Sequence, residues 1–388
     1  MSRDSRTEIL DVLHRFESES DLRRLYCELL NYEFIDVPIP TRDWATLARE
    51  VTEHGRVIAK RGSFYVVFLR IKKLTMTNER SVLNEVLKRY PECVVIFYGI
   101  EDGLWHIVSP RFDPGTPHKF LIRRYVVGPH ERLRTAAERL SLTYAVDEDS
   151  TARIKEKHDD AFDVEAVTRE FFETYKEVLN AVKNDLVKQK KADEQEAHAF
   201  TQQLLNRLMF LYFVQKKGWL NKDPRFIKDL WVKYEQFRSI NDNFYKAWIE
   251  PLFFYSFNKK PLPSNYDLPK EFVEIYGKMP YLNGGLFTRN ELDDVGFKVK
   301  DSHVRLIIDG LLERFNFTIR EDLPFDVEVA VDPEMLGKVY ESLVLEEERG
   351  KSGIFYTPRI EVDFMCRQAI IEYLVETKIG RASCRERV

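Results

Sequence analysis

The chain has 388 residues, enough for two or three domains, and its 44% hydrophobic and 32% charged residues are typical of a globular protein. A net charge of −4 excludes a small basic protein that coats nucleic acid, but not an enzyme with a locally positive groove. The run Leu208–Val214 is too short to span a bilayer, and the sequence shows no signal peptide. The four cysteines are not spaced as metal ligands. We therefore expect a cytoplasmic protein without membrane contact.

The first part of the chain, residues 1–146, alternates helical and strand patterns. Apolar residues follow helical spacing over Glu8–Leu30. Two nearly continuous apolar runs, Ser63–Ile71 and Cys93–Ile100, are typical of strands that are covered on both faces, and Asn78–Tyr90 between them has helical periodicity. Further strands are predicted at Leu104–Val108 and Phe120–Val127. We therefore expect a small α/β domain.

A second, mainly helical domain is predicted over residues 163–345. The charged stretch 147–162 before it, poor in apolar residues, is interpreted as a linker. Within the helical domain, Phe200–Val214 is apolar almost all round, as in a central helix, and Lys216–Gly218 should end it. Near the end of this domain, the sequence after Asp332 has the cap and first-turn proline of a helix.

Four blocks in the second half of the chain occur in an order that resembles one protein family. They are LLNRLMFLYFVQKKGWL (Leu204–Leu220), YLNGGLF (Tyr281–Phe287), DPEMLGKVYESL (Asp332–Leu343) and GIFYTPRIEVDFMCRQAI (Gly353–Ile370). Together they look like the region just before the catalytic core of large adenine-specific DNA methyltransferases of restriction–modification and phage-defence systems. The resemblance covers roughly residues 162–378, and several ordered blocks are more specific than any single one.

This resemblance implies that residues 346–378 begin a Rossmann-like methyltransferase domain. Phe355, Tyr356, Thr357 and Pro358 would then line the pocket near the amino-acid end of S-adenosylmethionine. The alternative needs no ligand, because a threonine followed by proline is also an ordinary helix start.

The motifs that would carry the chemistry are missing from this sequence. It contains no Asn/Asp-Pro-Pro-aromatic loop to hold a flipped adenine and no glycine-rich loop for the methyl donor, both of which the family places after the segment ending at Ile370. We therefore expect a truncated fragment that has no catalytic residues and is inactive alone. Residues 379–388 look like a reading frame through a sequencing adapter, so they are left out of the fold prediction.

The N-terminal domain resembles a degenerate nuclease of the PD-(D/E)xK kind, which single-chain restriction enzymes often carry. Such a nuclease holds Mg²⁺ with acids on two adjacent strands, but the position two before Lys72 is Arg70, which repels a metal. Glu53 or Asp36 could supply an upstream acid. No metal site is predicted, and Mg²⁺ would be needed only if the domain were active. Arg70, Lys72 and Lys73 either contact DNA phosphates or are solvated charges at a strand end.

The sequence thus predicts part of an enzyme that transfers a methyl group from S-adenosylmethionine to adenine N6 in double-stranded DNA. Other subunits of a defence system are further expected partners. Two alternatives remain open: a Mg²⁺-dependent endonuclease subunit, and a non-enzymatic helical module that binds DNA or protein.

Overall fold

The computed structural model describes most of the chain. The described residues are 3–41, 44, 51, 55–112, 120–190, 193–238, 240, 242–264, 266, 268–282, 284–319, 326–333, 335, 337, 357 and 359–376. They fall into two compact units, Met1–Val331 and Asp332–Val388. Within the described part of the chain, every helix is too short or too polar to cross a bilayer.

The first unit is built around a seven-stranded mixed sheet whose strands lie side by side in chain order. Strands β3 and β4 pair in parallel, as do β6 and β7, while the remaining neighbours are antiparallel. The strands are β1 Glu33–Ile39, β2 Gly55–Arg61, β3 Phe64–Ile71, β4 Cys93–Gly99, β5 Leu104–Phe112, β6 Phe120–Val127 and β7 Asp326–Glu328. This sheet and the helices around it confirm an α/β fold.

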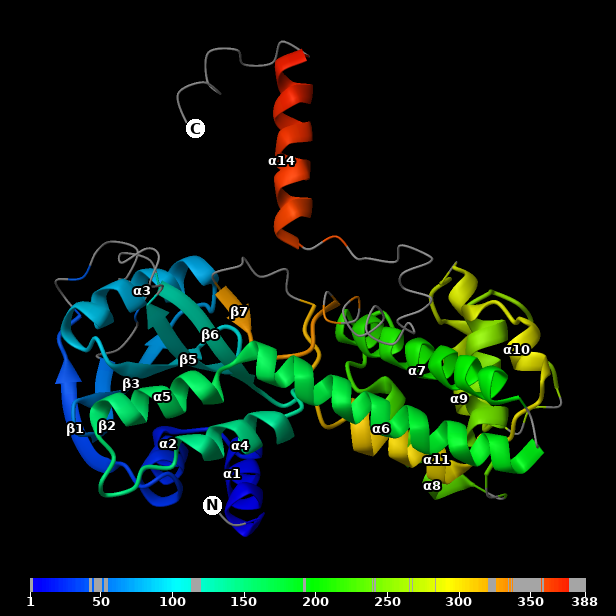
Figure 1. Ribbon diagram of the computed structural model, residues 1–388, viewed down its shortest axis with the longest axis horizontal. Coiled ribbons are helices and arrows are strands. Elements are labelled where there is room, and N and C mark those ends of the chain that lie inside the picture. The colour runs from blue at the N-terminus through cyan, green and yellow to red at the C-terminus, as the bar shows by residue number, and fades with distance from the viewer. Residues whose placement is uncertain are drawn as a thin grey trace. The chain divides into compact units, whose positions relative to one another are not determined.

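The predicted strand–helix–strand crossover is confirmed by β3, helix α3 (Met76–Arg89) and β4. Thr75 caps α3 by accepting the amide of Asn78 at 3.1 Å, and β3 pairs with β4 in the parallel register that places Val67 beside Val95. Helix α3 lies on one face of the sheet, and helices α1 and α5 lie on the other (Figure 1). Both faces are therefore covered, which explains the continuous apolar runs.

The N-terminal helical pattern is interrupted in the structure. The predicted stretch Glu8–Leu30 forms helix α1 (Arg3–His14), helix α2 (Glu19–Arg23) and a π-helical turn, η1 (Arg24–Leu29). Ser18 starts α2 through a capping box with Asp21, in which the Asp21 carboxylate accepts the Ser18 amide at 2.9 Å. The chain can therefore turn between α1 and α2 while keeping its apolar face on the sheet.

The stretch interpreted as a linker, residues 147–162, is largely helical in the structure. Most of it is helix α5 (Thr151–Ala161), with Ser150 accepting the amide of Arg153 at 3.2 Å as its cap. Its few apolar positions recur at helical spacing, so Ile154, His158 and Ala161 share one buried face although the segment as a whole is charged.

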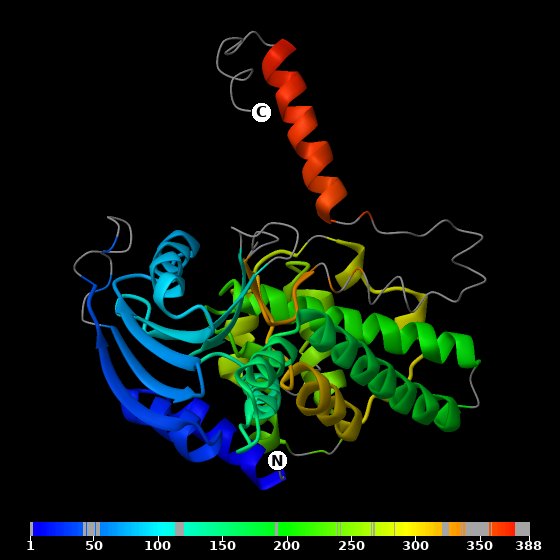
Figure 2. The same cartoon turned by 60° about the vertical axis from the view of Figure 1, so that its left-hand side comes forward.

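The helical region that follows is organised around two long helices, α6 (Val164–Lys190) and α7 (Glu194–Lys216), which run side by side (Figures 1 and 2). Helix α7 ends where the sequence predicts, because Gly218 adopts the left-handed φ of +74°. The elements packed around this pair are α8 Phe226–Phe237, η4 Tyr245–Ile249, η5 Leu252–Ser256, α9 Lys270–Gly277, η6 Gly285–Phe287, α10 Glu291–Asp294, α11 Asp301–Ile307 and η7 Ile308–Leu312.

After the helical region, the chain returns to the sheet. Strand β7 pairs in parallel with β6, so that Glu328 lies opposite Arg124, and an isolated bridge joins Phe317 to Val331. The helical region is therefore an insertion between two adjacent strands of one sheet, and residues on both sides of it belong to a single compact unit.

In the second unit the structure describes mainly helix α14 (Arg359–Glu376). At the first residue of this unit, the Asp332 carboxylate accepts the amide of Met335 at 2.8 Å, which confirms the helix cap predicted after Asp332. Most of the predicted helix after Asp332 lies outside the described residues, as does the adapter-like segment 379–388.

Candidate functional site

The end of strand β3 is the place where the nuclease resemblance would put a metal-binding acid. Arg70 occupies it, with its Nη2 atom 3.7 Å from Oε1 of Glu19 in α2 and its guanidinium 5.8 Å from the centre of the Phe68 ring. The position expected for a metal-binding acid is therefore occupied by the guanidinium of Arg70, whose charge is balanced by Glu19.

The upstream acid Asp36 on strand β1 is also paired with cations. Arg56 of the neighbouring strand contacts its Oδ1 atom from Nε at 2.7 Å and from Nη2 at 2.5 Å, and Arg23 lies 3.7 Å from Oδ2. Glu53, the other candidate acid, lies outside the described residues. Two guanidinium groups at one carboxylate do not fit a divalent cation, which needs anionic oxygen ligands without competing positive charge. Among the residues that the structure describes, no group of three His, Cys, Asp or Glu side chains could hold a metal ion.

The two lysines after Arg70 project from the end of β3 into solvent. The Lys72 side chain is 65% exposed, and its Nζ atom lies 3.9 Å from Glu101, while Lys73 is also exposed. Their ammonium groups are accessible to a phosphate, and equally to water. Their contact with DNA therefore stays a prediction.

Of the four residues predicted to line a methyl-donor pocket, the structure describes one. Thr357 is exposed and comes just before helix α14, in agreement with a helix start. Phe355, Tyr356 and Pro358 lie outside the described residues. An exposed hydroxyl at a helix start is compatible with binding a carboxylate, but it supplies only one of the groups that S-adenosylmethionine would need.

Two of the four resembling blocks meet at Arg207, whose buried ion pair and carbonyl contacts we call the Arg207 clamp. Arg207 of α7 binds Asp293 in a bidentate manner, with Nη1–Oδ1 at 2.6 Å and Nη2–Oδ2 at 2.9 Å, and both side chains are at most 2% exposed. Its Nε also donates to the carbonyl of Leu286 at 2.6 Å, and its Nη2 donates to that of Thr288 at 3.3 Å. The first block, Leu204–Leu220, thus holds the end of the Tyr281–Phe287 block in place.

The end of the Tyr281–Phe287 block is also held by a second set of contacts. Asn258 donates to the carbonyl of Phe287 at 2.9 Å, and the Phe287 ring packs 4.9 Å from Phe257 and 5.3 Å from Phe253, measured between ring centres. The sequence does not predict the clamp. The available signal was Arg207 itself, a charge within an otherwise apolar helical run that has to find a buried partner.

A second buried charge cluster lies between α3 and the sheet. The Glu79 carboxylate contacts His106 Nδ1 at 2.8 Å and Arg124 Nη1 at 3.0 Å, and all three side chains are at most 1% exposed. Burial alone would raise the pKa of Glu79, but His106 and Arg124 outweigh it and lower that pKa below its ordinary value. Sequence spacing gives no sign of this cluster, because its members come from a helix and two strands.

Part of the chain resembles a restriction–modification protein. Over 192 residues the chain is 32% identical to a protein of Methanocaldococcus jannaschii named "Putative type II restriction enzyme and methyltransferase". The similarity covers 47% of this chain and only 15% of that relative, so the chain spans a small part of the relative's length. No family model matches the chain. No solved structure matches it either. The predicted resemblance is therefore supported as far as restriction–modification, and the relative's name does not mention adenine.

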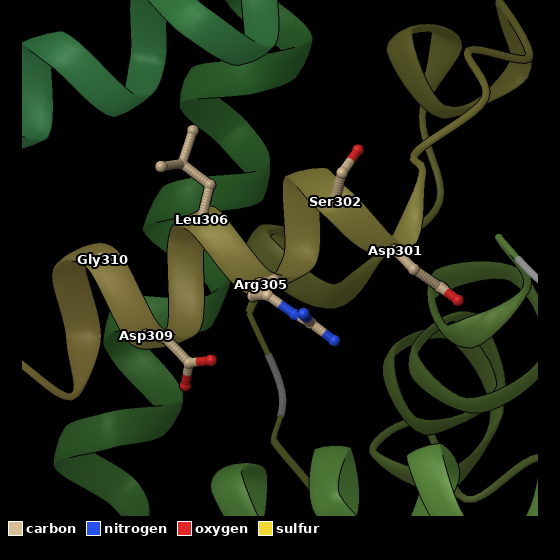
Figure 3. A pocket seen from close by; sticks show the side chains of 6 residues that line it. All are labelled: Asp301, Ser302, Arg305, Leu306, Asp309 and Gly310. Carbon is tan, nitrogen blue, oxygen red and sulfur yellow. The ribbon is translucent and has the colours of Figure 1, made fainter.

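A hollow of ≈ 540 Å³ on the helical region offers no second site. It runs along α11 and η7 and is lined by Asp301, Ser302, Arg305, Leu306, Asp309 and Gly310 (Figure 3). Its charged groups already have partners: Asp309 binds Lys228 at 2.5 Å, and Arg305 pairs with Glu235. The third charged group, Asp301, lies 3.5 Å from Arg238, so none of the three is left to act on a ligand.

Proposed function

We propose that this chain is the N-terminal part of an adenine-specific DNA methyltransferase of a restriction–modification or phage-defence system. The observation that carries the proposal is the 32% identity to a protein named as restriction enzyme and methyltransferase. The four ordered sequence blocks support the methyltransferase half of that name, and the Arg207 clamp gives two of them a shared structural role. Adenine N6 as the methylated atom rests on the sequence resemblance.

In this proposal the chain positions DNA and the catalytic domain, and it performs no chemistry itself. S-adenosylmethionine would supply the methyl group, and Phe355, Tyr356, Thr357 and Pro358 would hold the amino-acid end of that molecule. Arg70, Lys72 and Lys73 would contact phosphates of double-stranded DNA at the end of β3. Other subunits of a defence system are further expected partners.

The test of methyl transfer uses the natural gene, read beyond Lys378. The protein from the longer reading frame is incubated with duplex DNA and S-adenosylmethionine, and modified bases are identified by mass spectrometry of nucleosides. We expect N6-methyladenine from the longer protein and none from residues 1–388 alone. Methylated cytosine, or a longer frame without an Asn/Asp-Pro-Pro-aromatic motif, would refute the adenine assignment.

A second candidate function is DNA cleavage, which the words "restriction enzyme" in the relative's name favour. The cations around Asp36 and at Arg70 count against it, because they occupy the places of the metal and its ligand. Supercoiled plasmid is incubated with the chain and Mg²⁺, and nicked and linear products are measured. We expect no cleavage by the chain or by Arg70→Ala. Cleavage that requires Mg²⁺ and disappears in Asp36→Asn would establish the nuclease instead.

A further inference from the structure

A basic segment follows the central helix α7, and neither the nuclease-like sheet end nor the predicted methyl-donor pocket includes it. Residues 216–225 read KKGWLNKDPR, and we call them the KKGW loop. The loop carries four cationic side chains and one acidic one, in a chain whose net charge is −4. Residues 216–220 of the loop belong to the Leu204–Leu220 block, and the proposed function assigns no role to them.

The backbone of the KKGW loop is held in an uncommon conformation. Asn221 and Lys222 are consecutive non-glycine residues with left-handed φ angles of 52° and 56°, and Gly218 at 74° precedes them. The Lys222 amide donates to Gly218 at 3.1 Å, and Leu220 is fully buried beneath the loop. Such strain persists only where surrounding contacts impose it, and it is concentrated at functional positions.

The KKGW loop exposes a tryptophan. Trp219 is 59% exposed, whereas every other tryptophan is at most 8% exposed. Those four are Trp44, Trp105, Trp231 and Trp248. A large flat side chain left in water on a rigid loop is typical of a contact surface, since the indole combines two apolar faces with one N–H donor.

The lysines on either side of this indole in the sequence are available to a partner. Lys217 and Lys222 are both exposed, and neither ammonium group forms an ion pair with any of the described residues. Lys216 differs, because its Nζ atom binds the Glu131 carboxylate at 2.6 Å. The charges of Lys217 and Lys222 are therefore directed to solvent, while Lys216 fixes the base of the loop.

The loop is also braced against the sheet-bearing part of the molecule. Arg132, which follows strand β6, donates to the Pro224 carbonyl at 3.3 Å and adds to the Lys216–Glu131 contact. The residues on either side of the loop are also joined, because the Gln215 side chain accepts the amide of Ile227 at 3.0 Å. With both ends held, binding a partner would order few additional groups, which favours affinity.

We propose that the KKGW loop contacts duplex DNA, with Lys217 and Lys222 on backbone phosphates and the Trp219 indole against the sugar–phosphate surface. Its charge favours DNA over a protein partner, because a loop with four cationic side chains and one acidic one fits a regularly spaced polyanion. The inference rests on the proposed function for DNA as the partner, and it adds a contact surface outside the sheet end where Arg70, Lys72 and Lys73 lie.

The first test measures binding of fluorescein-labelled duplex DNA to the whole chain by anisotropy, over a series of salt concentrations. Replacing both Lys217 and Lys222 by Gln should reduce the slope of log K against log salt by about 2, because each phosphate contact contributes about 0.9. Trp219→Ala should weaken binding by roughly tenfold. The controls are Lys88→Gln, a lysine on α3 whose side chain is 68% exposed, and Phe237→Ala, an aromatic that is 56% exposed, and neither should change affinity.

The second test uses Trp219 as its own reporter. Because the other tryptophans are buried, iodide in solution should quench mainly the fluorescence of Trp219, and Trp219→Phe should remove that quenchable fraction. Saturating duplex DNA should protect the wild-type signal from iodide. Full quenching in the presence of bound DNA would overturn the proposal.

The outcomes separate this inference from the function on which it rests. If the wild-type chain binds duplex DNA and the KKGW variants bind as tightly with the same salt slope, the loop assignment is wrong while the proposed function stands. If the folded wild-type chain binds no DNA, the DNA role of this chain is refuted and the loop assignment falls with it. Circular dichroism of each variant verifies folding, which loop-surface substitutions should not disturb.

Discussion

The amide of Val329 donates a 2.8 Å hydrogen bond to the carbonyl of Arg124, although the whole helical region lies between them in the chain. The bond continues the parallel pairing of β7 with β6, in which Glu328 lies opposite Arg124. The buried Glu328 carboxylate in turn accepts Asn316 at 3.0 Å and Thr318 at 2.8 Å. These contacts close the insertion of the helical region between β6 and β7.

The first prediction follows from that closure. Val329→Pro removes the donor and leaves the carbonyl of Arg124 without this bond in a buried place, so we expect the free energy of unfolding to fall by about 1–3 kcal/mol. Urea denaturation followed by circular dichroism measures the loss. Glu291→Pro is the control, because it occupies the first position of α10, where proline is tolerated, and it should change stability little. Equal losses in both variants would contradict a specific role for the β7 closure.

The second prediction concerns the Arg207 clamp. Asp293→Asn leaves the buried guanidinium of Arg207 without its counter-charge, which should cost about 3–5 kcal/mol of unfolding free energy. Arg153→Ala breaks an ion pair with Glu156 at 2.9 Å whose side chains are 56% and 64% exposed, and it should cost less than about 1 kcal/mol. Denaturant titrations compare the two. A small loss in Asp293→Asn would mean that the clamp does not hold the Tyr281–Phe287 turn.

The third prediction concerns the charge cluster beneath α3. In Glu79→Gln the shape is kept, but Arg124 and His106 lose the carboxylate between them, so we expect a loss of about 3–5 kcal/mol. The control lies on the same helix: Glu85→Gln affects only the pair of Glu85 with the exposed Lys88, and it should alter stability by less than about 1 kcal/mol. Thermal or urea unfolding that ranks the two variants equally would rule out a stabilising role for the cluster.

The features that the sequence predicts correctly are those determined by residues close to one another in the sequence. Strands β3 and β4 follow from continuous apolar runs, and α7 follows from its apolar pattern with Gly218 at its end. Strand β1 has no such pattern, because most of its residues are exposed and its pairing with β2 alone defines it. Strand β7 has three residues and depends on contacts with β6 from a distant part of the chain. Local periodicity carries no information about either pairing.

The candidate sites follow the same division. Arg70 could be assessed from the sequence, because a motif position needs only its own residue, and the structure adds that Glu19 is its partner. The Arg207–Asp293 pair could not be predicted, since nothing near Arg207 in the sequence identifies its acid. The predicted pocket residues Phe355–Pro358 stay a prediction, because Thr357 is their single described member.

The last prediction is a pH dependence that originates at His158 in α5. The imidazole is buried, stacks on Phe64 with 4.4 Å between ring centres, and lies 2.9 Å from the Tyr32 hydroxyl through Nε2. Burial disfavours the charged form and lowers the pKa of His158 from 6.5 to about 3. Unfolded chains therefore take up this proton below pH 6.5, while folded chains do so only near pH 3. The stability that the neutral form provides is complete above pH 6.5 and is lost as the pH falls toward 3.

His158→Gln removes this proton uptake, so its unfolding free energy should fall less steeply than that of the wild type between pH 6.5 and 3. The difference in slope should approach about 1.4 kcal/mol per pH unit in the middle of that range, the value for one proton bound only by the unfolded state. Urea denaturation at half-unit pH steps measures it, and His130→Gln, at an exposed position, serves as the control that should keep the wild-type slope. Parallel curves for wild type and His158→Gln would contradict this prediction, because they would show that folded and unfolded chains bind the proton of His158 equally well. The rings of Phe64, Phe162 and Tyr32 packed around the imidazole argue against that outcome.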